Sequence, residues 1–459
     1  AVLVCCLSPL LFGFSLGFTS PVQATMEGDA KGVRHPSRAA GDLIIFSPAE
    51  FTIYAALLNV GAVPGAFAGS WAMDRLGRRN ALALSAVPHV IAWGVTIVVS
   101  SPAVLQHLRL LTGFAVGMGS AVAPCYINEV APAALRGPLG IAFQFALTLG
   151  ILLVNVAGDY GPVVEEVHRH LFGNWRRLAM VGATVASVLL SMACTPESPK
   201  WLAQQGRGEE AREALAALRS GGAPVEEATL AAVARTARAG GAAQAEAPRA
   251  PRVVDYKLSL LVAVGVMVFQ QLSGINAIMM YSTSICAQAG MADPAVAALG
   301  IMVAQVALTG AASGLVELAG RRSLMQASGA SMCLSHLALA YYMAAAERGW
   351  WAPPWLALAS LAVFIVGFST GMGPVPWVVV GEVFPGEVLG SASAVATAVM
   401  WICSFNVCLG FPALQAALGK SGVFLLFAGF CFGCLAFVTA LVPETKGRSV
   451  DEVLELLRA

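Results

Sequence analysis

Charged residues are scarce in this chain of 459 residues, because Asp, Glu, Lys and Arg make up only 12% of it while 58% is hydrophobic. Soluble globular proteins carry about 25% charged residues, so the polar surface here is too small to cover a water-exposed globule. The 27 basic and 26 acidic residues balance, which leaves no basic field to attract a nucleic acid. These shortages exclude a soluble enzyme, a disordered protein and a nucleic-acid binder, and they indicate a polytopic membrane protein.

Two further absences narrow the class. No cluster of His, Cys, Asp and Glu has the spacing of a metal site, so we expect no metal, no cofactor and no enzymatic reaction. The ten cysteines all lie in or beside apolar stretches, which is typical of small buried residues and not of a disulfide framework. We therefore expect an all-α membrane protein that moves or binds a ligand.

Twelve long apolar stretches can each cross a bilayer, which requires about 20 such residues in a helix. They run approximately over 2–23, 51–73, 80–100, 104–127, 139–158, 178–195, 258–289, 296–319, 324–346, 355–381, 391–417 and 421–442. Two of them are interrupted, the seventh by the sequence QQLSGIN over 270–276 and the tenth by GMGP over 371–374. Broken helices at membrane depth line cavities, so these two stretches indicate a binding site.

Short motifs recur at an offset of about 245 residues, as when Gly77 of DRLGRR corresponds to Gly320 of ELAGRR. An equal offset in the same order predicts two six-helix halves related by duplication. We assign the first half to 1–195, a helical linker to 196–257, the second half to 258–442 and a tail to 443–459. Within the linker, helices are expected near 207–219 and 224–238. Lys and Arg are most frequent on the side of the linker and tail, which places that side in the cytoplasm.

Acidic and basic residues collect at the predicted cytoplasmic helix ends, at matching positions of the two repeats. The positive-inside rule explains arginines there, but it does not explain acids that recur at corresponding positions. Pairs between them could hold the cytoplasmic side shut in one state and separate in another. The candidate residues of this cytoplasmic gate are Asp74, Arg75, Arg78, Arg79, Glu129, Arg136, Glu197, Glu317, Arg321, Arg322, Glu382, Glu444 and Arg448.

The polar residues in the middle of the predicted spans are mainly amides and indoles. Amides donate and accept hydrogen bonds, and indoles add a flat apolar face, a combination that suits a neutral polyhydroxylated ring better than an ion. A lone amide could equally bond a neighbouring helix, but three amides in one interrupted stretch favour a binding site. The candidate site residues are Gln144, Gln270, Gln271, Asn276, Gln305, Trp377 and Trp401.

A proton-coupled carrier needs a titratable group in its transport path, and the first span has no carboxylate around Ser15. Facilitated diffusion is therefore favoured over proton symport. Two histidines, His89 and His336, fall inside spans and are interpreted as packing residues.

Seven motifs, in order along the chain, carry a family resemblance. They are DRLGRR at 74–79, YINEVAPAALRG at 126–137, PESPKWL at 196–202, QQLSGIN at 270–276, ELAGRR at 317–322, GPVPW at 373–377 and PETKGRS at 443–449. Together they resemble the sugar porter family of the major facilitator superfamily, specifically the facilitative glucose transporters. The resemblance implies hexose transport by alternating access and places Tyr281 at an extracellular gate. It assigns six of the candidate residues to the sugar site, namely Gln144, Gln270, Gln271, Asn276, Trp377 and Trp401.

The chain departs from the best-known glucose carriers at four positions. Gln305 and Met400 stand where those carriers have asparagine, Ser369 where they have glutamate, and Leu389 where they have a basic residue. The differences at Gln305, Met400 and Ser369 leave the preferred sugar open, and Leu389 removes one charge from the gate of the second half. Gln305 and the sequence FGFSLGFTSPV over 12–22 resemble the intracellular-vesicle branch and the insect trehalose carriers.

The expected function is thus the uniport of a hexose such as glucose, with a proton–sugar symporter and a sugar sensor that does not transport as alternatives. The expected partners are a sugar and the lipid bilayer, and no nucleic acid. We expect a monomer in the plasma membrane or in an intracellular vesicle membrane.

Overall fold

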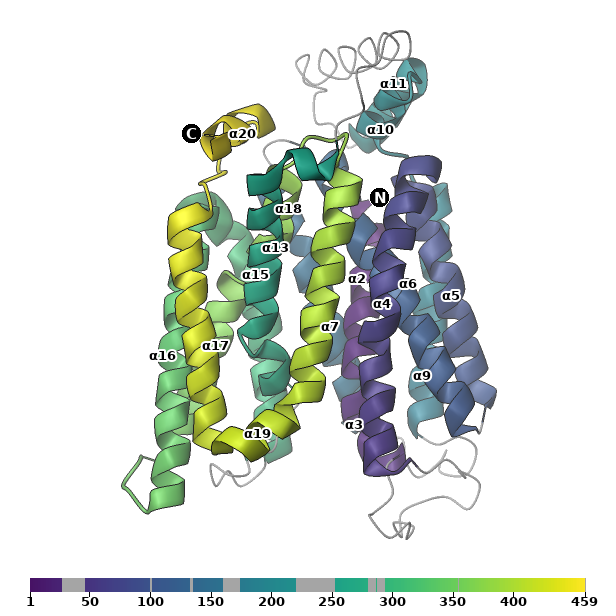
Figure 1. The fold of residues 1–459 in the computed structure, drawn as a ribbon. Helices are drawn as coiled ribbons and strands as arrows, with labels where there is room; N and C mark the ends of the chain where they lie inside the picture. The colour runs from purple at the N-terminus through teal and green to yellow at the C-terminus, as the bar shows by residue number, and fades with distance from the viewer. Residues whose placement is uncertain are drawn as a thin grey trace.

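The protein forms an upright bundle of helices that run roughly along one axis (Figure 1). The computed structural model describes residues 1–26, 46–99, 101–132, 135–159, 174–219, 252–279, 286, 294–353 and 355–458. The first half contains α1 (Val2–Cys5), α2 (Leu7–Gly17), α3 (Thr19–Met26), α4 (Pro48–Leu76), α5 (Arg78–Val98), α6 (Pro102–Val130), α7 (Arg136–Asp159), α9 (Asn174–Leu189) and the 3-10 turn η3 (Leu190–Cys194). The linker contains α10 (Pro199–Gln204), α11 (Gly208–Arg219) and the 3-10 turn η4 (Val253–Asp255).

The second half mirrors the first in its run of long helices. It contains α13 (Lys257–Leu272), α15 (Pro294–Ala319), α16 (Arg321–Arg348), α17 (Trp355–Thr370), α18 (Val375–Glu382) and α19 (Leu389–Leu441), and α20 (Val450–Arg458) follows it. The described residues include eleven helical segments that are long and apolar enough to cross a membrane. The remaining predicted span, the ninth at 324–346, lies in α16, which is equally long but less apolar. The predicted all-α membrane fold of two six-helix halves is confirmed.

The helices break where the sequence predicts. Helix α13 ends at Leu272, and the chain resumes a helical course only after Gly274, whose φ is +82°. A Cβ atom on Gly274 would also lie 2.9 Å from the ring of Phe427, so glycine is required there twice over. Residues 371–374 form a turn between α17 and α18. Both breaks therefore lie at membrane depth in the second half, and they free backbone groups in the interior.

Helix α19 covers both of the last two predicted spans. Gly419, with φ +72° and ψ 171°, interrupts its helical geometry. The ribbon turns back there, at the end of the bundle opposite α10 and α11 (Figure 1). The two arms of α19 then pack in different places, since α19 contacts α13 and α16 within its own half and α4 of the other half.

Close packing of α4 on α6 rests on small residues. A Cβ atom on Gly61 would lie 2.0 Å from the carbonyl oxygen of Leu110, and one on Gly65 would lie 2.1 Å from that of Phe114. Such approaches leave no room for a side chain, as in other membrane helix pairs built on glycine stripes. The two halves meet mainly where α4 packs on α19 and where α7 packs on α15.

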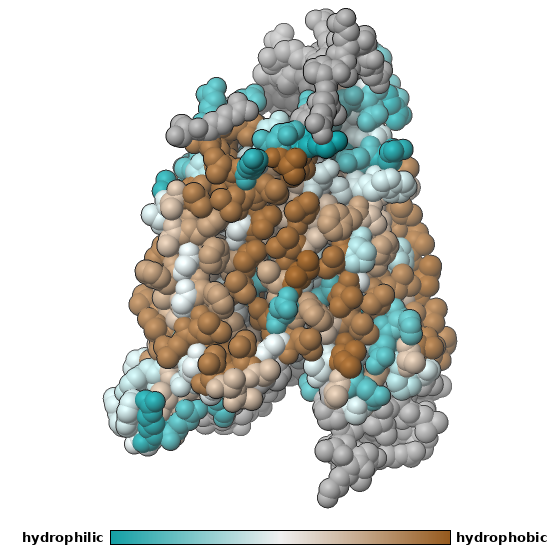
Figure 2. Space-filling model, in the orientation of Figure 1, coloured by the Kyte–Doolittle hydropathy of each residue, from teal (hydrophilic) through white to brown (hydrophobic). Residues whose placement is uncertain are grey.

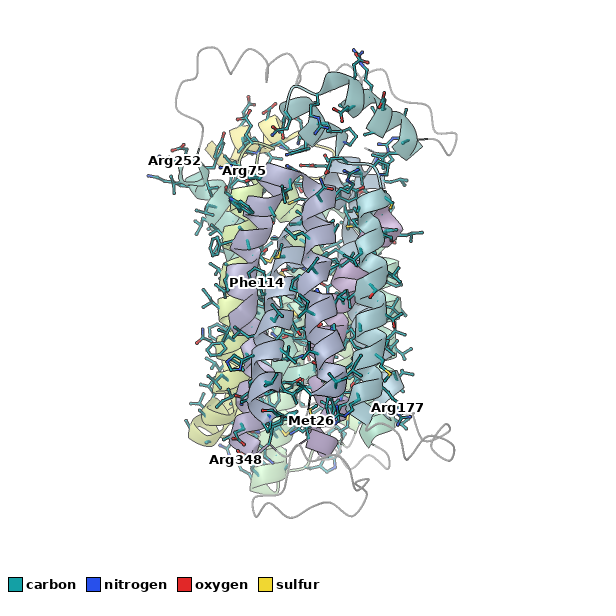
Figure 3. The ribbon with its side chains drawn as sticks, turned by 90° about the vertical axis from the view of Figure 1, so that its right-hand side faces the viewer. Met26, Arg75, Phe114, Arg177, Arg252 and Arg348 are labelled. Atoms are coloured by element: carbon teal, nitrogen blue, oxygen red, sulfur yellow. The ribbon has the colours of Figure 1, made fainter. Side chains whose placement is uncertain are left out.

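One end of the bundle carries α10, α11 and α20, and we call it the linker end (Figure 1). The first predicted linker helix, near 207–219, is confirmed as α11, whereas the second, near 224–238, lies outside the described residues. Arg75 and Arg252 mark the linker end, and Arg177 and Arg348 mark the opposite end (Figure 3). Hydrophobic residues dominate the surface between the two ends (Figure 2), as expected for a face in contact with lipid.

Candidate functional site

A cavity of about 250 Å³ lies between the two halves. Residues of α2, α3, α4, α6 and α7 line it from the first half, and residues of α13, α15, α17, α18 and α19 line it from the second. All seven candidate site residues line this one cavity: Gln144, Gln270, Gln271, Asn276, Gln305, Trp377 and Trp401. Helices distant in sequence therefore bring the candidate site together.

Three amides on the broken seventh span form a hydrogen-bonded chain. The Gln270 Nε2 atom donates to the carbonyls of Met372 and Gly373, at 3.0 and 2.8 Å, and so binds the turn between α17 and α18. Gln271 Nε2 donates to Gln270 Oε1 at 3.1 Å, and Asn276 Nδ2 donates to Gln271 Oε1 at 2.7 Å. Gln270 thus uses both of its donors on the protein, which fits a bracing function beneath the cavity.

Two other amides are available to a ligand. Gln144 on α7 and Gln305 on α15 are only 5% and 3% exposed, and neither makes a hydrogen bond to the residues that the structure describes. A buried amide without a partner is costly, and both side chains lie on the cavity wall. They come from opposite halves, so one ligand between them would contact both.

Two tryptophans give the cavity flat apolar walls. Trp377 packs against Phe143 with the ring centroids 4.6 Å apart, and its buried Nε1 atom has no hydrogen-bond partner among the described residues. Trp401 packs against Phe12 at 4.9 Å, and its Nε1 atom donates to Ser120 Oγ at 3.3 Å. The Trp377 indole N–H therefore remains available to donate a hydrogen bond to a ligand hydroxyl. The indole N–H of Trp401 is already used in a bond between the two halves.

One residue of the cavity wall was missed from the sequence. Arg109 on α6 is 3% exposed, lines the cavity, donates from Nη1 to the carbonyl of Ser15 at 2.8 Å and lies 5.3 Å from the ring centroid of Tyr54. No carboxylate lies among the described residues of the cavity wall. A single arginine near the start of a span resembles an ordinary end-of-helix charge, and only the packing of α2 and α4 around it shows that it is buried.

The cavity extends toward the end opposite the linker. Its lining includes Thr19 and Gln23 of α3 and Thr52 near the start of α4, and both segments lie at the end of the bundle remote from α10 (Figure 1). The molecular surface is notched at this end between the two halves (Figure 2). At the linker end, α18 packs on α6 and α7 and thereby closes the space between the halves. The structure is therefore open at one end and shut at the other.

Ion pairs at the linker end connect helices within each half. In the first half, Arg78 at the start of α5 pairs with Glu129 at the end of α6, with Nε–Oε2 and Nη2–Oε1 distances of 2.9 Å and both side chains 2% exposed. Ser198 Oγ donates to Glu129 Oε2 at 2.5 Å, so the linker joins this cluster. A two-pronged contact of this kind satisfies both carboxylate oxygens of a buried acid.

The second half repeats the arrangement. Arg321 at the start of α16 pairs with Glu382 at the end of α18, with an Nη2–Oε1 distance of 3.0 Å, and with Glu317 at 3.3 Å. Thr445 Oγ1 donates to Glu382 Oε2 at 2.5 Å, in the place that Ser198 occupies in the first half. The repeat read from the sequence is thus a repeat of hydrogen bonds.

Two further acids bind helix N-termini. Glu197 Oε1 accepts from the backbone N–H of Arg79 at 3.0 Å, and Glu444 accepts from the backbone N–H groups of Arg321 and Arg322 at 3.0 and 3.1 Å. The first N–H groups of a helix have no partner within it, so a carboxylate is favoured there. Burial raises the pKa of Glu197, and the backbone N–H groups of Arg79 and Ser198 oppose that rise.

Glycine makes these contacts possible. Gly77 and Gly320 precede α5 and α16 with φ of +91° and +85°. A Cβ atom at Gly77 would lie 2.3 Å from Glu197 Oε2, and one at Gly320 would lie 2.5 Å from Glu444 Oε2. Both the backbone angle and the nearby carboxylate exclude a side chain at these positions.

Contacts between the halves at the linker end have a different chemistry. Asp74 at the end of α4 lies against the start of α19, where a Cβ atom on Gly390 would be 2.7 Å from Asp74 Oδ1. Glu317 lies against the start of α7 in the same way, beside Gly137. Each acid therefore faces the positive end of a helix that belongs to the other half. The sequence did not indicate these two contacts between the halves.

Several predicted gate residues do not form the expected pairs. Arg75 is exposed, and neither it nor Arg448 forms an ion pair with a residue that the structure describes. The Arg79 side chain instead donates to Asn80 Oδ1 and the carbonyl of Thr195, and that of Arg322 donates to the carbonyl of Thr439. The side chain of Arg136 and all of Tyr281 lie outside the described part of the chain.

Two halves of membrane-spanning helices, with a cavity between them that is lined by amides and indoles and open at one end, define the class of a membrane carrier. The profile of the family described as "Sugar (and other) transporter" matches residues 1–457. The chain belongs to this family of sugar transporters, and it is a multi-pass membrane protein.

Characterised relatives cover nearly the whole chain. It is 35% identical to mouse "Solute carrier family 2, facilitated glucose transporter member 8", over 97% of this chain and 91% of that protein. It is 32% identical to "Facilitated trehalose transporter Tret1" of Polypedilum vanderplanki, over 99% of this chain and 86% of that protein. A solved structure of the proton:xylose symporter XylE with 6-bromo-6-deoxy-D-glucose superposes with a TM-score of 0.81 at 23% identity, over 99% of both chains, and shows the same fold.

Proposed function

We propose that this protein is a uniporter for a hexose such as glucose and works by alternating access. The observation that carries the proposal is the cavity wall, where the free amides of Gln144 and Gln305 from opposite halves face one space. Neutral amides match the hydroxyls of a sugar ring, and the indole of Trp377 matches its C–H face. The curated relatives support the sugar class, because their names record facilitated glucose and trehalose transport.

Uniport is favoured over proton symport by the charge of the cavity. The described residues of its wall include Arg109 but no carboxylate, and a guanidinium keeps its proton at every physiological pH. Proton symport is the second candidate, since the solved structure that shares the fold is a proton:xylose symporter.

The proposed transport cycle follows from the difference between the open end of the bundle and the closed linker end. We place the linker end in the cytoplasm by its basic residues, so that the cavity faces outward. A sugar would enter between the halves, contact amides of both, and favour closure around itself. The helix-end contacts of Asp74 and Glu317 would then separate, and the linker end would open. The ion pairs of Arg78 and Arg321 would keep each half rigid during this motion. We place the boundaries of the halves at 195 and 258, and we propose that a monomer suffices.

Sugar counterflow tests this function. Purified protein in liposomes preloaded with unlabelled glucose should accumulate labelled glucose transiently above the external concentration. Liposomes preloaded in the same way but without protein should not. A panel of competing hexoses and disaccharides would rank the substrates. Absence of counterflow with every sugar of the panel, from protein shown to be folded, would contradict the proposal.

A further inference from the structure

A line of hydrogen bonds leaves the amide chain of α13 and reaches the other half. Asn276 Nδ2 donates to Ser404 Oγ on α19 at 3.1 Å, and Ser404 Oγ donates to Asn59 Oδ1 on α4 at 2.9 Å. Asn59 and Ser404 are each 3% exposed, and both line the cavity. The line therefore runs from the turn between α17 and α18 through Gln270, Gln271, Asn276 and Ser404 to the first half.

The amide orientations in the structure set the direction of these bonds. A hydroxyl has one proton, and Ser404 donates it to Asn59, which leaves its lone pairs to accept from Asn276. Asn59 in the first half thus orients the hydroxyl that holds an amide of the second half. A chain of polarised, buried hydrogen bonds makes each member depend on the others.

The same line crosses the interface that must shift in transport. The bond from Ser404 to Asn59 joins α19 to α4, one of the two main contacts between the halves. If the halves tilt, this bond changes length, while the bonds among Gln270, Gln271 and Asn276 stay within one half. The orientation of Asn276 is thus tied to the relative position of the halves.

We propose that Asn59 and Ser404 are positioning residues that couple the sugar-binding amides to the movement of the two halves. The inference rests on the proposed function as a sugar carrier. By linkage, a bond that favours the ligand-ready orientation of Asn276 is itself favoured when the ligand binds. A sugar that contacts Asn276 therefore changes the strength of a contact between the halves. Sugar binding and the relative position of the halves are thus coupled.

A double-mutant cycle tests this coupling. We expect Asn59→Ala to raise the sugar concentration at half-maximal counterflow by about 3- to 10-fold, in line with one lost hydrogen bond. Asn276→Ala should have a similar or larger effect, and adding Asn59→Ala to it should change nothing further, although the two residues do not touch. Ser404→Ala should reproduce Asn59→Ala, and Ser404→Thr, which keeps the hydroxyl, should restore the wild-type value.

A matched control separates coupling from general weakening of the interface. Ser393 Oγ on α19 donates to the carbonyl of Ala121 in the other half at 3.1 Å, but it is not part of this line. The effects of Ser393→Ala and Asn276→Ala should multiply as independent changes. Independent effects of Asn59→Ala and Asn276→Ala, or wild-type half-saturation in Ser404→Ala, would overturn the inference. If the wild-type protein shows no counterflow, the proposed function fails instead, which is a distinguishable result.

Discussion

Hydrogen-bond capacity differs among the amides of the cavity, and this difference decides what each one can do. Gln270 spends its donors on Met372 and Gly373, whereas Gln144 and Gln305 are bonded to no described residue and face the cavity. The former holds a broken helix in place, and the latter two are ready for a ligand.

Removal of the free amides should therefore reduce affinity without unfolding the protein. We expect Gln144→Ala and Gln305→Ala each to raise the half-saturation of sugar uptake by about 2- to 10-fold, the effect of one lost hydrogen bond. Gln326→Ala is the control, because Gln326 is bonded to Thr439 in an exposed region of α16. Uptake by both cavity variants at the wild-type half-saturation would show that the ligand lies elsewhere.

Arg109 should be sensitive to conservative substitution. Its Nη1 atom reaches the carbonyl of Ser15 while its guanidinium lies over Tyr54, a geometry that an ammonium group does not reproduce. We expect Arg109→Lys to lower the maximal uptake rate several-fold. Arg176 is a matched control, since it also donates to a backbone carbonyl and lies over a tryptophan ring but does not line the cavity. Equal losses in Arg109→Lys and Arg176→Lys would indicate a general packing effect.

The sequence predicted residue types better than partners. Gln144, Gln305 and Trp377 could be chosen because polar groups are rare in membrane spans, and they do line one cavity. Asn59 and Ser404 were missed, because a single small polar residue in a span has no pattern of its own. Their importance arises only from the approach of α4 to α19, which no local signal encodes.

At the scale of elements, the broken helices shape the cavity, and the helix N-termini bind acids at the linker end. The breaks near Gly274 and Gly373 were readable from glycine and proline within apolar stretches, whereas the contacts of Glu197 and Glu444 with the N-termini of α5 and α16 were not. The sequence indicated that these acids would meet arginine side chains. The structure shows that backbone N–H groups bind them, because the glycines at 77 and 320 let the carboxylates approach.

Substitution of these glycines should be more damaging than backbone strain alone. Gly77→Ala forces a left-handed φ on alanine and also pushes a Cβ atom against Glu197. Gly206→Ala isolates the first effect, since Gly206 has φ +75° and open space around it. We expect a cost of about 1–2 kcal/mol for strain at Gly206 and a larger loss of thermal stability for Gly77→Ala. Equal melting temperatures for the two variants would show that the contact with Glu197 is unimportant.

At the scale of the whole molecule, the structure is open at one end and closed at the linker end, where Asp74 and Glu317 face helices of the other half. We propose that these contacts hold the linker end shut. Locking that end should stop transport but not entry of the ligand. In a background without the exposed Cys194, the pair Asp74→Cys and Gly390→Cys should form a disulfide under oxidation. We expect oxidation to abolish counterflow and reduction to restore it, while sugar binding persists in both states. Full counterflow in the cross-linked protein would rule out the proposed opening of this end.

The central claim is that a neutral sugar moves down its own gradient. The most direct measurement is the steady-state level of labelled glucose in proteoliposomes, with and without an inward proton gradient. A uniporter brings the internal concentration to the external one in both conditions, and the gradient changes neither level. Accumulation above the external concentration that collapses with a proton ionophore would contradict this account and identify a symporter.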